Sequence, residues 1–201
     1  MNLFIATSNE HKAAEFARLL AGRGLTGWTV LSAAEAGGMP PVEETAEDFE
    51  GNAWLKARAM KERAGRRGWV VADDSGLEVD ALGGAPGVRS ARFAGESATD
   101  AENNARLLRE LAGRPIAERR ARFRCVLALL APDGREESFT GVCEGRIAGA
   151  PSGGGGFGYD PLFIPEGYES PFAELGETVK NRISHRARAW ELLVERLGRE
   201  V

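Results

Sequence analysis

Two adjacent aspartates, Asp73 and Asp74, stand at the end of a short apolar run. The run, residues 69–72, has the composition of a buried strand, and the following Ser75-Gly76 pair predicts a turn. Neighbouring strand residues point to opposite faces of a sheet, so only one of the two carboxylates can face a given site. Carboxylates at strand ends hold Mg²⁺ and activate water, although Asp-Asp-Ser-Gly can also simply close a turn.

A second polar set, Thr7, Ser8 and Asn9, follows a predicted strand at residues 2–6 and can cap the helix after it. The first amides of a helix have no partner within the helix and attract phosphate. We therefore predict that these three residues and the nearby amides bind a phosphate tail. Lys12, one turn further on, adds a positive charge.

The glycine-rich segment at residues 153–161, GGGGFGYDP, is the most unusual stretch of the chain. Four consecutive glycines are compatible with a flexible linker, but a linker rarely continues into Phe-Gly-Tyr-Asp-Pro-Leu-Phe-Ile. An aromatic ring beside flexible backbone is a suitable place for a planar base to stack. Phe157 is accordingly a candidate for base stacking.

A basic segment near the C-terminus, residues 180–186, leads into a predicted helix that Ser184 can cap. His185 and Arg186 then lie in the first turn, where positive charge opposes the helix dipole. An anion or a carbonyl ligand would offset that cost, which makes both side chains candidates for ligand binding. The alternative is that both point to solvent.

The elements that must position these residues alternate between strands and helices. Further strands are predicted at residues 121–131 and 138–147, joined by a Pro-Asp-Gly hairpin at 132–134, and apolar alternation resumes at residues 77–81. Helices are predicted after Asn9, after Asp48, at residues 99–111 and after Ser184. This order predicts an α/β fold with a mixed β-sheet flanked by helices.

Helical periodicity also predicts core positions. They are Phe16, Leu19 and Leu20 in the first helix, Phe49, Ala53, Ala57 and Met60 in the second, and Ala187, Trp190, Val194 and Leu197 in the last. Asn52 and Lys56 lie one turn apart on another face of the second helix, where they are either solvated or face a cleft. Several glycines at residues 83–87 permit positive φ or close backbone approach.

The composition narrows the possible functions. A length of 201 residues with 43% hydrophobic and 28% charged residues fits an ordinary globular protein of one domain or two lobes. The net charge of -4 argues against a sequence-independent nucleic-acid binder. No apolar run is long enough to span a membrane and no signal peptide is recognisable, so we expect a cytoplasmic protein without a membrane partner. Cys125 and Cys143 lack zinc-ligand spacing and are expected to be reduced structural thiols.

Taken in order, the motifs of this chain resemble those of the inosine triphosphate pyrophosphatase family, also called XTP/dITP diphosphatases. The resemblance covers nearly the whole chain, from position 6 to 186, and many individually weak motifs occur in the family's order. They are residues 6–12 (ATSNEHK), 43–45 (EET) with 52–53 (NA), 72–77 (ADDSGL), 83–87 (GGAPG), 90–93 (SARF), 155–161 (GGFGYDP) and 183–186 (ISHR).

The resemblance implies an elongated mixed α/β structure in which residues 1–201 form a single two-lobed domain around a central cleft, usually assembled as a homodimer. It also implies Mg²⁺-dependent hydrolysis of a nucleoside triphosphate between the α and β phosphates, which yields the monophosphate and pyrophosphate. Its preferred substrates carry deaminated purines, as in ITP, dITP and XTP, and their removal cleanses the nucleotide pool.

The resemblance further assigns roles to single residues. It places Glu44 and Asp74 at the metal and makes Asp74 the proton acceptor for the attacking water, with Asp73 on the opposite face. The substrate contacts that we predict are Thr7, Ser8, Asn9, Lys12, Ser75, Phe157, Gly158, Tyr159, Asp160, Lys180, His185 and Arg186. Hydrogen-bond donors such as Arg186 or His185 would bind the 6-oxo group of a purine and discriminate against adenine, whose 6-amino group donates. Asp160 would accept a hydrogen bond from a ring N–H.

The chain departs from the family pattern at Ser8, where glycine is common, and at Gly51, where the family often has glutamate. Two alternative functions stay open: a pyrophosphatase for other modified nucleotides, and a nucleotide-binding regulatory module without catalysis. The presence of Lys12, Glu44 and Asp74 argues against the second. A P-loop NTPase is disfavoured because GxxxxGK[ST] is absent, and the glycine run does not fit a dinucleotide-binding site.

Overall fold

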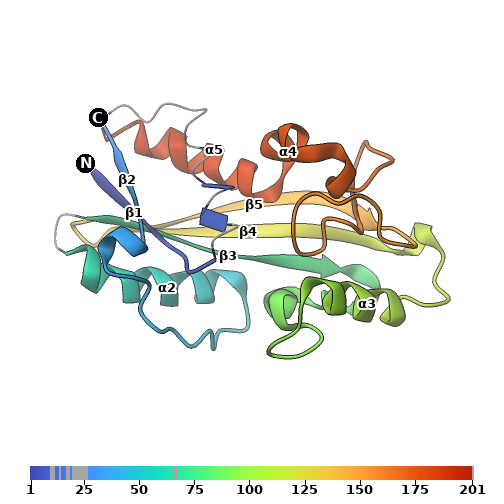
Figure 1. The fold of residues 1–201 in the computed structure, drawn as a ribbon. Coiled ribbons are helices and arrows are strands. Elements are labelled where there is room, and N and C mark those ends of the chain that lie inside the picture. The colour runs from blue at the N-terminus through green and yellow to red at the C-terminus, as the bar shows by residue number, and fades with distance from the viewer. Residues whose placement is uncertain (10–11, 14, 17–18, 20–26, 66–67, 201) are drawn as a thin grey trace. The chain divides into compact units, whose positions relative to one another are not determined.

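The protein contains a six-stranded sheet flanked by helices (Figure 1), seen in a computed structural model that describes residues 1–9, 12–13, 15–16, 19, 27–65 and 68–200. The strand order is β2-β1-β3-β4-β5-β6. The strands are β1 (Asn2–Ala6), β2 (Thr29–Ser32), β3 (Trp69–Val79), β4 (Arg120–Leu130), β5 (Glu136–Ile147) and β6 (Phe163–Pro165). The longer helices with described bounds are α2 (Phe49–Ala64), α3 (Asp100–Glu110), α4 (Phe172–Ile183) and α5 (His185–Leu197).

The sheet is mixed, as the sequence predicted. Strand β1 pairs in parallel with both β2 and β3, whereas β5 and β6 pair antiparallel. The predicted hairpin between β4 and β5 is confirmed: the amide of Gly134 donates to the carbonyl of Ala131, and Gly134 has a φ of 91°.

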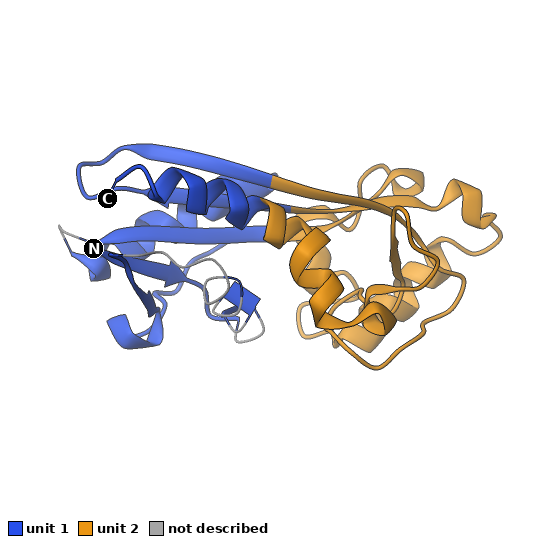
Figure 2. Cartoon of the chain, turned by 90° about the horizontal axis from the view of Figure 1, so that it is seen from above, with its two compact units in different colours: residues 1–74, 125–140, 189–201 blue, residues 75–124, 141–188 orange. Residues whose placement is uncertain are grey.

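The chain divides into two compact units (Figure 2). Unit 1 contains residues 1–74, 125–140 and 189–201, and unit 2 contains residues 75–124 and 141–188. The boundaries fall within β3, β4, β5 and α5, so each of these elements contributes residues to both units.

Unit 1 is built around the parallel strands β1 to β3, with α2 on one face and the C-terminal part of α5 on the other (Figure 1). Small residues of the strands, such as Ala6 and Ala72, pack in one core cluster with the predicted core positions of α2, among them Met60. The helix begins where the sequence predicted, because the carboxylate of Asp48 accepts a hydrogen bond from the amide of Gly51.

Unit 2 has an aromatic core. Fully buried leucines of α3 meet the inner face of β3 and a group of stacked rings, and the members of this cluster include Leu77, Leu107, Phe123, Phe163 and Phe172. Helix α3 starts with a complete capping box between Thr99 and Glu102, and it covers the predicted stretch at residues 99–111.

Three local predictions were wrong. Ser75 and Gly76 do not form a turn, because β3 runs without interruption from Trp69 to Val79. The alternation predicted at residues 77–81 continues this strand only to Val79, since Asp80–Leu82 form a short 3-10 helix. Burial on both sides of the Ser-Gly pair and pairing with the next strand override the local turn propensity. In α5, Val194 is only half-buried, whereas Leu193 is fully buried. Leu20 lies outside the described residues.

Two short strands, β2 and β6, were not predicted at all, since four and three residues give too little pattern to detect. Both cysteines are buried free thiols, as expected, and burial raises the pKa of Cys143 to about 11. No described helix has the length and apolar character needed to cross a membrane.

Candidate functional site

The predicted phosphate-binding turn after β1 is a helix cap. The hydroxyl of Thr7 accepts a hydrogen bond from the amide of Asn9 at 3.1 Å, and the Asn9 side chain accepts one from the amide of Lys12 at 3.1 Å. Ser8 and Asn9 are exposed, whereas Thr7 is half-buried. The polar residues of the turn therefore lie together at the start of a helix, as the sequence predicted.

Lys12 forms an ion pair across unit 1 with Asp73. Its Nζ lies 2.8 Å from Oδ1 of Asp73, whose side chain is almost fully buried. The other carboxylate oxygen, Oδ2, lies 3.9 Å from Sγ of Cys125, which also belongs to unit 1. Asp73 therefore pairs with Lys12, which the sequence predicted to bind phosphate. The ammonium group of Lys12 keeps further hydrogen-bond donors after this one contact.

The neighbouring carboxylate, Asp74, pairs with Lys56 instead. Lys56 Nζ lies 2.7 Å from Oδ1 of Asp74 and 3.3 Å from Oε1 of Glu44. A single ammonium group thereby brings together the two carboxylates that the sequence assigned to the metal. The alternating faces of β3 explain why adjacent aspartates reach different lysines.

The titration of this cluster is set by burial and by its neighbours. Burial raises the pKa of Asp74 above its ordinary value, and this effect outweighs the opposing charges of Lys56 and Lys12. For Lys56, burial alone would lower the pKa, but the carboxylates of Asp74, Asp73 and Glu44 raise it above its usual value. Lys56 therefore stays charged, while Asp74 binds a proton more readily than an exposed aspartate.

The carboxylates fit a divalent cation of the magnesium type. Oδ2 of Asp74 is buried and accepts no hydrogen bond from any residue that the structure describes, so this oxygen has capacity for a ligand. Mg²⁺ is commonly held by one or two carboxylates together with substrate phosphates, which is the set that Asp74 and Glu44 offer. Within the described ranges, no group of three or more His, Cys, Asp and Glu side chains is arranged to hold a metal ion.

The loop that carries Glu44 is fixed by the first turns of α2. Asn52 accepts a hydrogen bond from the amide of Ala46 at 3.0 Å and donates one to its carbonyl at 3.3 Å. Gly51 lies directly against the same residue, since a Cβ added to Gly51 would stand 2.5 Å from that of Ala46. Both peptide groups of Ala46 are therefore held by one side chain, close in sequence to Glu44.

In unit 2, Ser75 is bound to Arg186. The guanidinium Nη2 donates to Oγ of Ser75 at 2.8 Å, and Arg186 is buried at the start of α5. His185 is also buried, and its ring stacks on Phe123 with centroids 4.8 Å apart. Ser184 caps the helix by accepting from the amide of Ala187, as predicted. The alternative that His185 and Arg186 point to solvent is thereby excluded.

Phe157 lies between two positive charges. Nζ of Lys180 is 4.4 Å from the centroid of its ring, and the guanidinium carbon of Arg186 is 5.3 Å away. Asp160 fixes the loop, because its Oδ2 accepts from the amide of Phe157 at 2.9 Å and from Lys180 at 2.6 Å. Four of the predicted substrate contacts are thus neighbours in unit 2.

The glycine run is a packed loop rather than a linker. The amide of Gly155 donates to the carbonyl of Ala173 in α4, and a side chain at Gly153 would collide with that same backbone. At Gly156, with a φ of 74°, a side chain would collide with Asp160. These glycines are required because the loop lies directly against its neighbours.

Two further predicted contacts have structural partners. Tyr159 is buried in the core of unit 2, and its hydroxyl donates to the carbonyl of Ser90 at 2.8 Å. Burial, with the charge of Asp100, raises its pKa. Gly158 is held through its backbone, because its amide donates to Asp100 and its carbonyl accepts from Asn104.

Lys56 is the functional residue that the sequence left undecided. Its position one turn after Asn52, on a face without the core residues, was the available signal, but two alternatives fitted it equally. The partner, Asp74, lies 18 positions further along the chain, and no local pattern connects the two. Only the fold brings them together.

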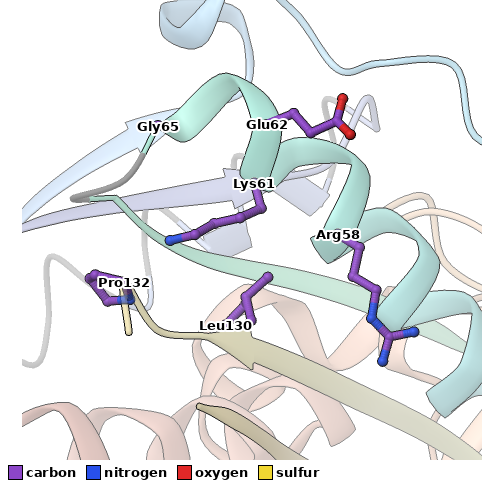
Figure 3. A pocket seen from close by; sticks show the side chains of 6 residues that line it. All are labelled: Arg58, Lys61, Glu62, Gly65, Leu130 and Pro132. Atoms are coloured by element: carbon purple, nitrogen blue, oxygen red, sulfur yellow. The ribbon is translucent and has the colours of Figure 1, made fainter. Parts of the chain in front are cut away.

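Unit 1 also contains a shallow pocket that is lined by none of these residues. It encloses about 390 Å³ and is lined by Arg58, Lys61, Glu62, Gly65, Leu130 and Pro132 (Figure 3). Its cations are already engaged: Arg58 binds Glu136, and Lys61 donates to the carbonyl of Gly68. No predicted site residue lines it, so this pocket does not belong to the candidate site.

Comparison with known proteins tests the predicted family. A model described as the Ham1 family matches residues 3–196. A protein of Opitutus terrae named dITP/XTP pyrophosphatase is 50% identical over 198 residues, which cover 97% of this chain and 98% of that protein. Another of that name, from Desulforamulus reducens, is 50% identical over 199 residues, which cover 99% and 96%.

Solved structures agree. The Ham1 protein of Staphylococcus aureus is 38% identical, with a TM-score of 0.87 and coverage of 100% of both chains. A HAM1 protein from Coxiella burnetii is 39% identical, with a TM-score of 0.87 and coverage of 98% of both chains. The enzyme class predicted from the sequence matches the names of the curated relatives. The chain therefore belongs to the Ham1 family, as its motifs predicted.

Proposed function

We propose that the protein hydrolyses nucleoside triphosphates with deaminated purine bases, namely ITP, dITP and XTP, to the monophosphate and pyrophosphate. The names of its half-identical relatives support this reaction. The single structural observation that carries the proposal is the cluster of Glu44, Lys56 and Asp74, in which a buried carboxylate oxygen is left without a hydrogen-bond donor among the described residues.

The phosphate tail is proposed to bind at the turn after β1. Thr7, Ser8 and Asn9 offer hydroxyl and amide groups at a helix start, which is a favourable environment for anions. Lys12 adds an ammonium group that Asp73 holds in place. The pair limits the conformations that the lysine can adopt.

Asp74 is proposed to accept the proton of the attacking water. Its raised pKa makes it a better base than an ordinary aspartate, and its free oxygen is the available acceptor. Lys56 holds the carboxylates of Asp74 and Glu44 near one another. Asp74 and Glu44 would hold Mg²⁺, which would supply positive charge to neutralise and polarise the phosphates.

The base is proposed to be selected by residues of unit 2. Phe157 offers a ring for stacking, and the buried donors Arg186 and His185 suit a 6-oxo group, which accepts where adenine's 6-amino group donates. Lys180 and Asp160 hold the loop of Phe157. A contact from Asp160 to a ring N–H stays a prediction.

The test is a release assay with ITP, dITP, XTP, GTP and ATP, in Mg²⁺ and in EDTA. We expect pyrophosphate as the primary product, a requirement for metal, and preference for the first three substrates. Orthophosphate as the primary product would contradict the cleavage position, and equal use of ATP and GTP would contradict the base selection. Methylated and pyrimidine triphosphates in the same panel test the alternative pyrophosphatase.

We also propose that the protein acts on the cytoplasmic nucleotide pool as a homodimer. The motif resemblance supports the homodimer and the action on the nucleotide pool. Light scattering with size-exclusion chromatography gives the mass directly, and a monomer at the concentration used in the assay would contradict the dimer.

A further inference from the structure

Two side chains of α3 bind the peptide groups of Gly158. Its amide donates to Oδ2 of Asp100 at 2.6 Å, and its carbonyl accepts from Nδ2 of Asn104 at 2.9 Å. Asp100 and Asn104 are four residues apart, so they lie one above the other on the same face of the helix. We call these two side chains the α3 clamp. In unit 1 the single side chain of Asn52 binds the amide and the carbonyl of Ala46 in a similar way.

The helix that carries the clamp is firmly anchored. Its N-terminus is closed by the capping box of Thr99 and Glu102, and Leu107 and Leu111 at its other end are fully buried. Asn104 itself is 8% exposed. A buried amide has few alternative partners, and the hydrogen bond from Gly158 to a carboxylate is of the stronger, charge-assisted type.

The clamp fixes the backbone on the C-terminal side of Phe157. Gly158 adopts a φ of 62°, a conformation that side-chain-bearing residues rarely take, and both of its peptide hydrogen bonds go to α3. On the other side, the amide of Phe157 is held by Asp160. The peptides that flank Phe157 are therefore both fixed, which leaves its ring in contact with Lys180 and Arg186.

We propose that Asp100 and Asn104 are positioning residues that set the orientation of the Phe157 ring and thereby sharpen the selection of the base. The inference rests on the proposed function, in which Phe157 stacks on that base. The two residues act through Gly158 and do not touch the substrate. Loss of the clamp should weaken and broaden base recognition while leaving the residues of unit 1 as they are.

The chain offers a matched control in Asn103. This buried asparagine is adjacent to Asn104 on α3, and it also bridges a loop through its amide group, donating to the carbonyl of Ala91 at 3.0 Å and accepting from the amide of Ala94 at 2.7 Å. Its partners lie outside the glycine run. Removal of Asn103 therefore tests whether any loss of a buried asparagine on this helix has the same effect.

The experiment compares the wild type with Asn104→Ala, Asp100→Ala, Asp100→Asn and Asn103→Ala. KM and kcat are measured for ITP and GTP, and amide hydrogen exchange is followed in a peptide that covers residues 153–160. We expect Asn104→Ala to raise KM for ITP about three- to tenfold, as the loss of one hydrogen bond predicts, with little change in kcat. The ratio of kcat/KM for ITP to that for GTP should fall, and exchange in the glycine run should accelerate.

Asp100→Ala should raise KM by a similar or smaller factor, because the charge-assisted bond that it removes is exposed to solvent. Asp100→Asn, which keeps an oxygen acceptor, should restore most of the affinity. Asn103→Ala should keep the wild-type KM, ITP preference and exchange of the glycine run, even if it lowers the melting temperature.

Wild-type KM and ITP preference in both Asn104→Ala and Asp100→Ala would overturn the inference, as would equal effects of Asn103→Ala and Asn104→Ala. A wild type that does not prefer ITP would contradict the proposed function instead. In that case the exchange measurement still decides, because unaltered exchange of residues 153–160 in both clamp variants would show that α3 does not position the loop.

Discussion

The two units carry chemically different sets of predicted site residues. In unit 1 these side chains are ions in pairs: Lys12 with Asp73, and Lys56 with Asp74 and Glu44. In unit 2 the centre is an aromatic ring, Phe157, in contact with two cations. In each unit a helix also holds both peptide groups of one loop residue, Ala46 in unit 1 and Gly158 in unit 2.

This contrast predicts which property of the protein a substitution in each unit should change most. A buried ion pair leaves an uncompensated charge when one partner is removed, so changes in unit 1 should affect stability together with turnover or phosphate binding. A stacking surface loses contact area and orientation instead, so changes in unit 2 should chiefly alter affinity and base preference. Four substitutions test this division, in order of decreasing expected effect.

Asp74→Asn should lower kcat by about two orders of magnitude or more, because the neutral amide cannot accept the proton of the attacking water. The fold should be retained, since the side chain keeps its size. Turnover is measured as pyrophosphate release at saturating ITP, together with thermal melting. Asp133→Asn, on the exposed hairpin, is the control and should leave turnover unchanged. A folded Asp74→Asn protein with near-normal kcat would refute the assignment.

Lys12→Ala should raise KM for ITP about tenfold or more through the loss of a charged phosphate donor. It should also lower the melting temperature, because the ion pair between Lys12 and the buried carboxylate of Asp73 is lost.

The double variant Lys12→Ala/Asp73→Asn separates these two effects. Replacing the Asp73 carboxylate by an amide should recover part of the stability while KM stays high. Recovery of KM together with stability would show that Lys12 acts on the fold and not on the phosphates.

Phe157→Leu should lower kcat/KM for ITP about tenfold, since it removes the face on which a base stacks and keeps an apolar side chain. Phe93→Leu is the matched control: Phe93 is also half-buried in unit 2, and the guanidinium carbon of Arg106 lies 4.4 Å from its ring centroid. Equal losses in the two variants would point to a general effect on the packing of unit 2.

Lys56→Met should move the acidic limb of the pH profile of kcat/KM to higher pH. The charge of Lys56 lowers the pKa of Asp74, whereas burial and Glu44 raise it. Without the lysine the pKa of Asp74 rises further, so the ionised base is lost at a higher pH as the solution is acidified.

The control for this shift is Lys61→Met, on the same helix, whose ammonium group donates to the carbonyl of Gly68 and not to a carboxylate. Its profile should match that of the wild type. If the acidic limb of the Lys56→Met profile lies at the same pH as in the wild type, a group other than Asp74 determines its position.

Local signals in the sequence predicted most elements correctly. The cap at Asp48, the Pro-Asp-Gly hairpin and the cap at Ser184 are each decided by contacts within a few residues. The prediction at Ser75-Gly76 failed because a turn-forming pair is here enclosed in a long buried strand, and burial and strand pairing depend on residues far away in the chain.

The candidate site shows the same limit. The family resemblance placed Asp74 and Glu44 at the metal and the sequence placed Lys12 at the phosphates, but the partners of these charges did not follow from the sequence. Lys56 illustrates this best, since its importance depends on a contact with β3 that no periodicity of α2 reveals. The clamp on Gly158 joins positions even further apart, at 54 and 58 residues.

The close approach of Gly51 to Ala46 has an evolutionary consequence. A side chain at position 51 can be accommodated only if the backbone at position 46 retreats, and Asn52 holds that backbone. Since Glu44 lies two residues before Ala46, its carboxylate would be displaced by the same movement. Positions 46 and 51 are therefore expected to vary as a pair among descendants of this sequence, with each change at one restricting the changes that selection accepts at the other.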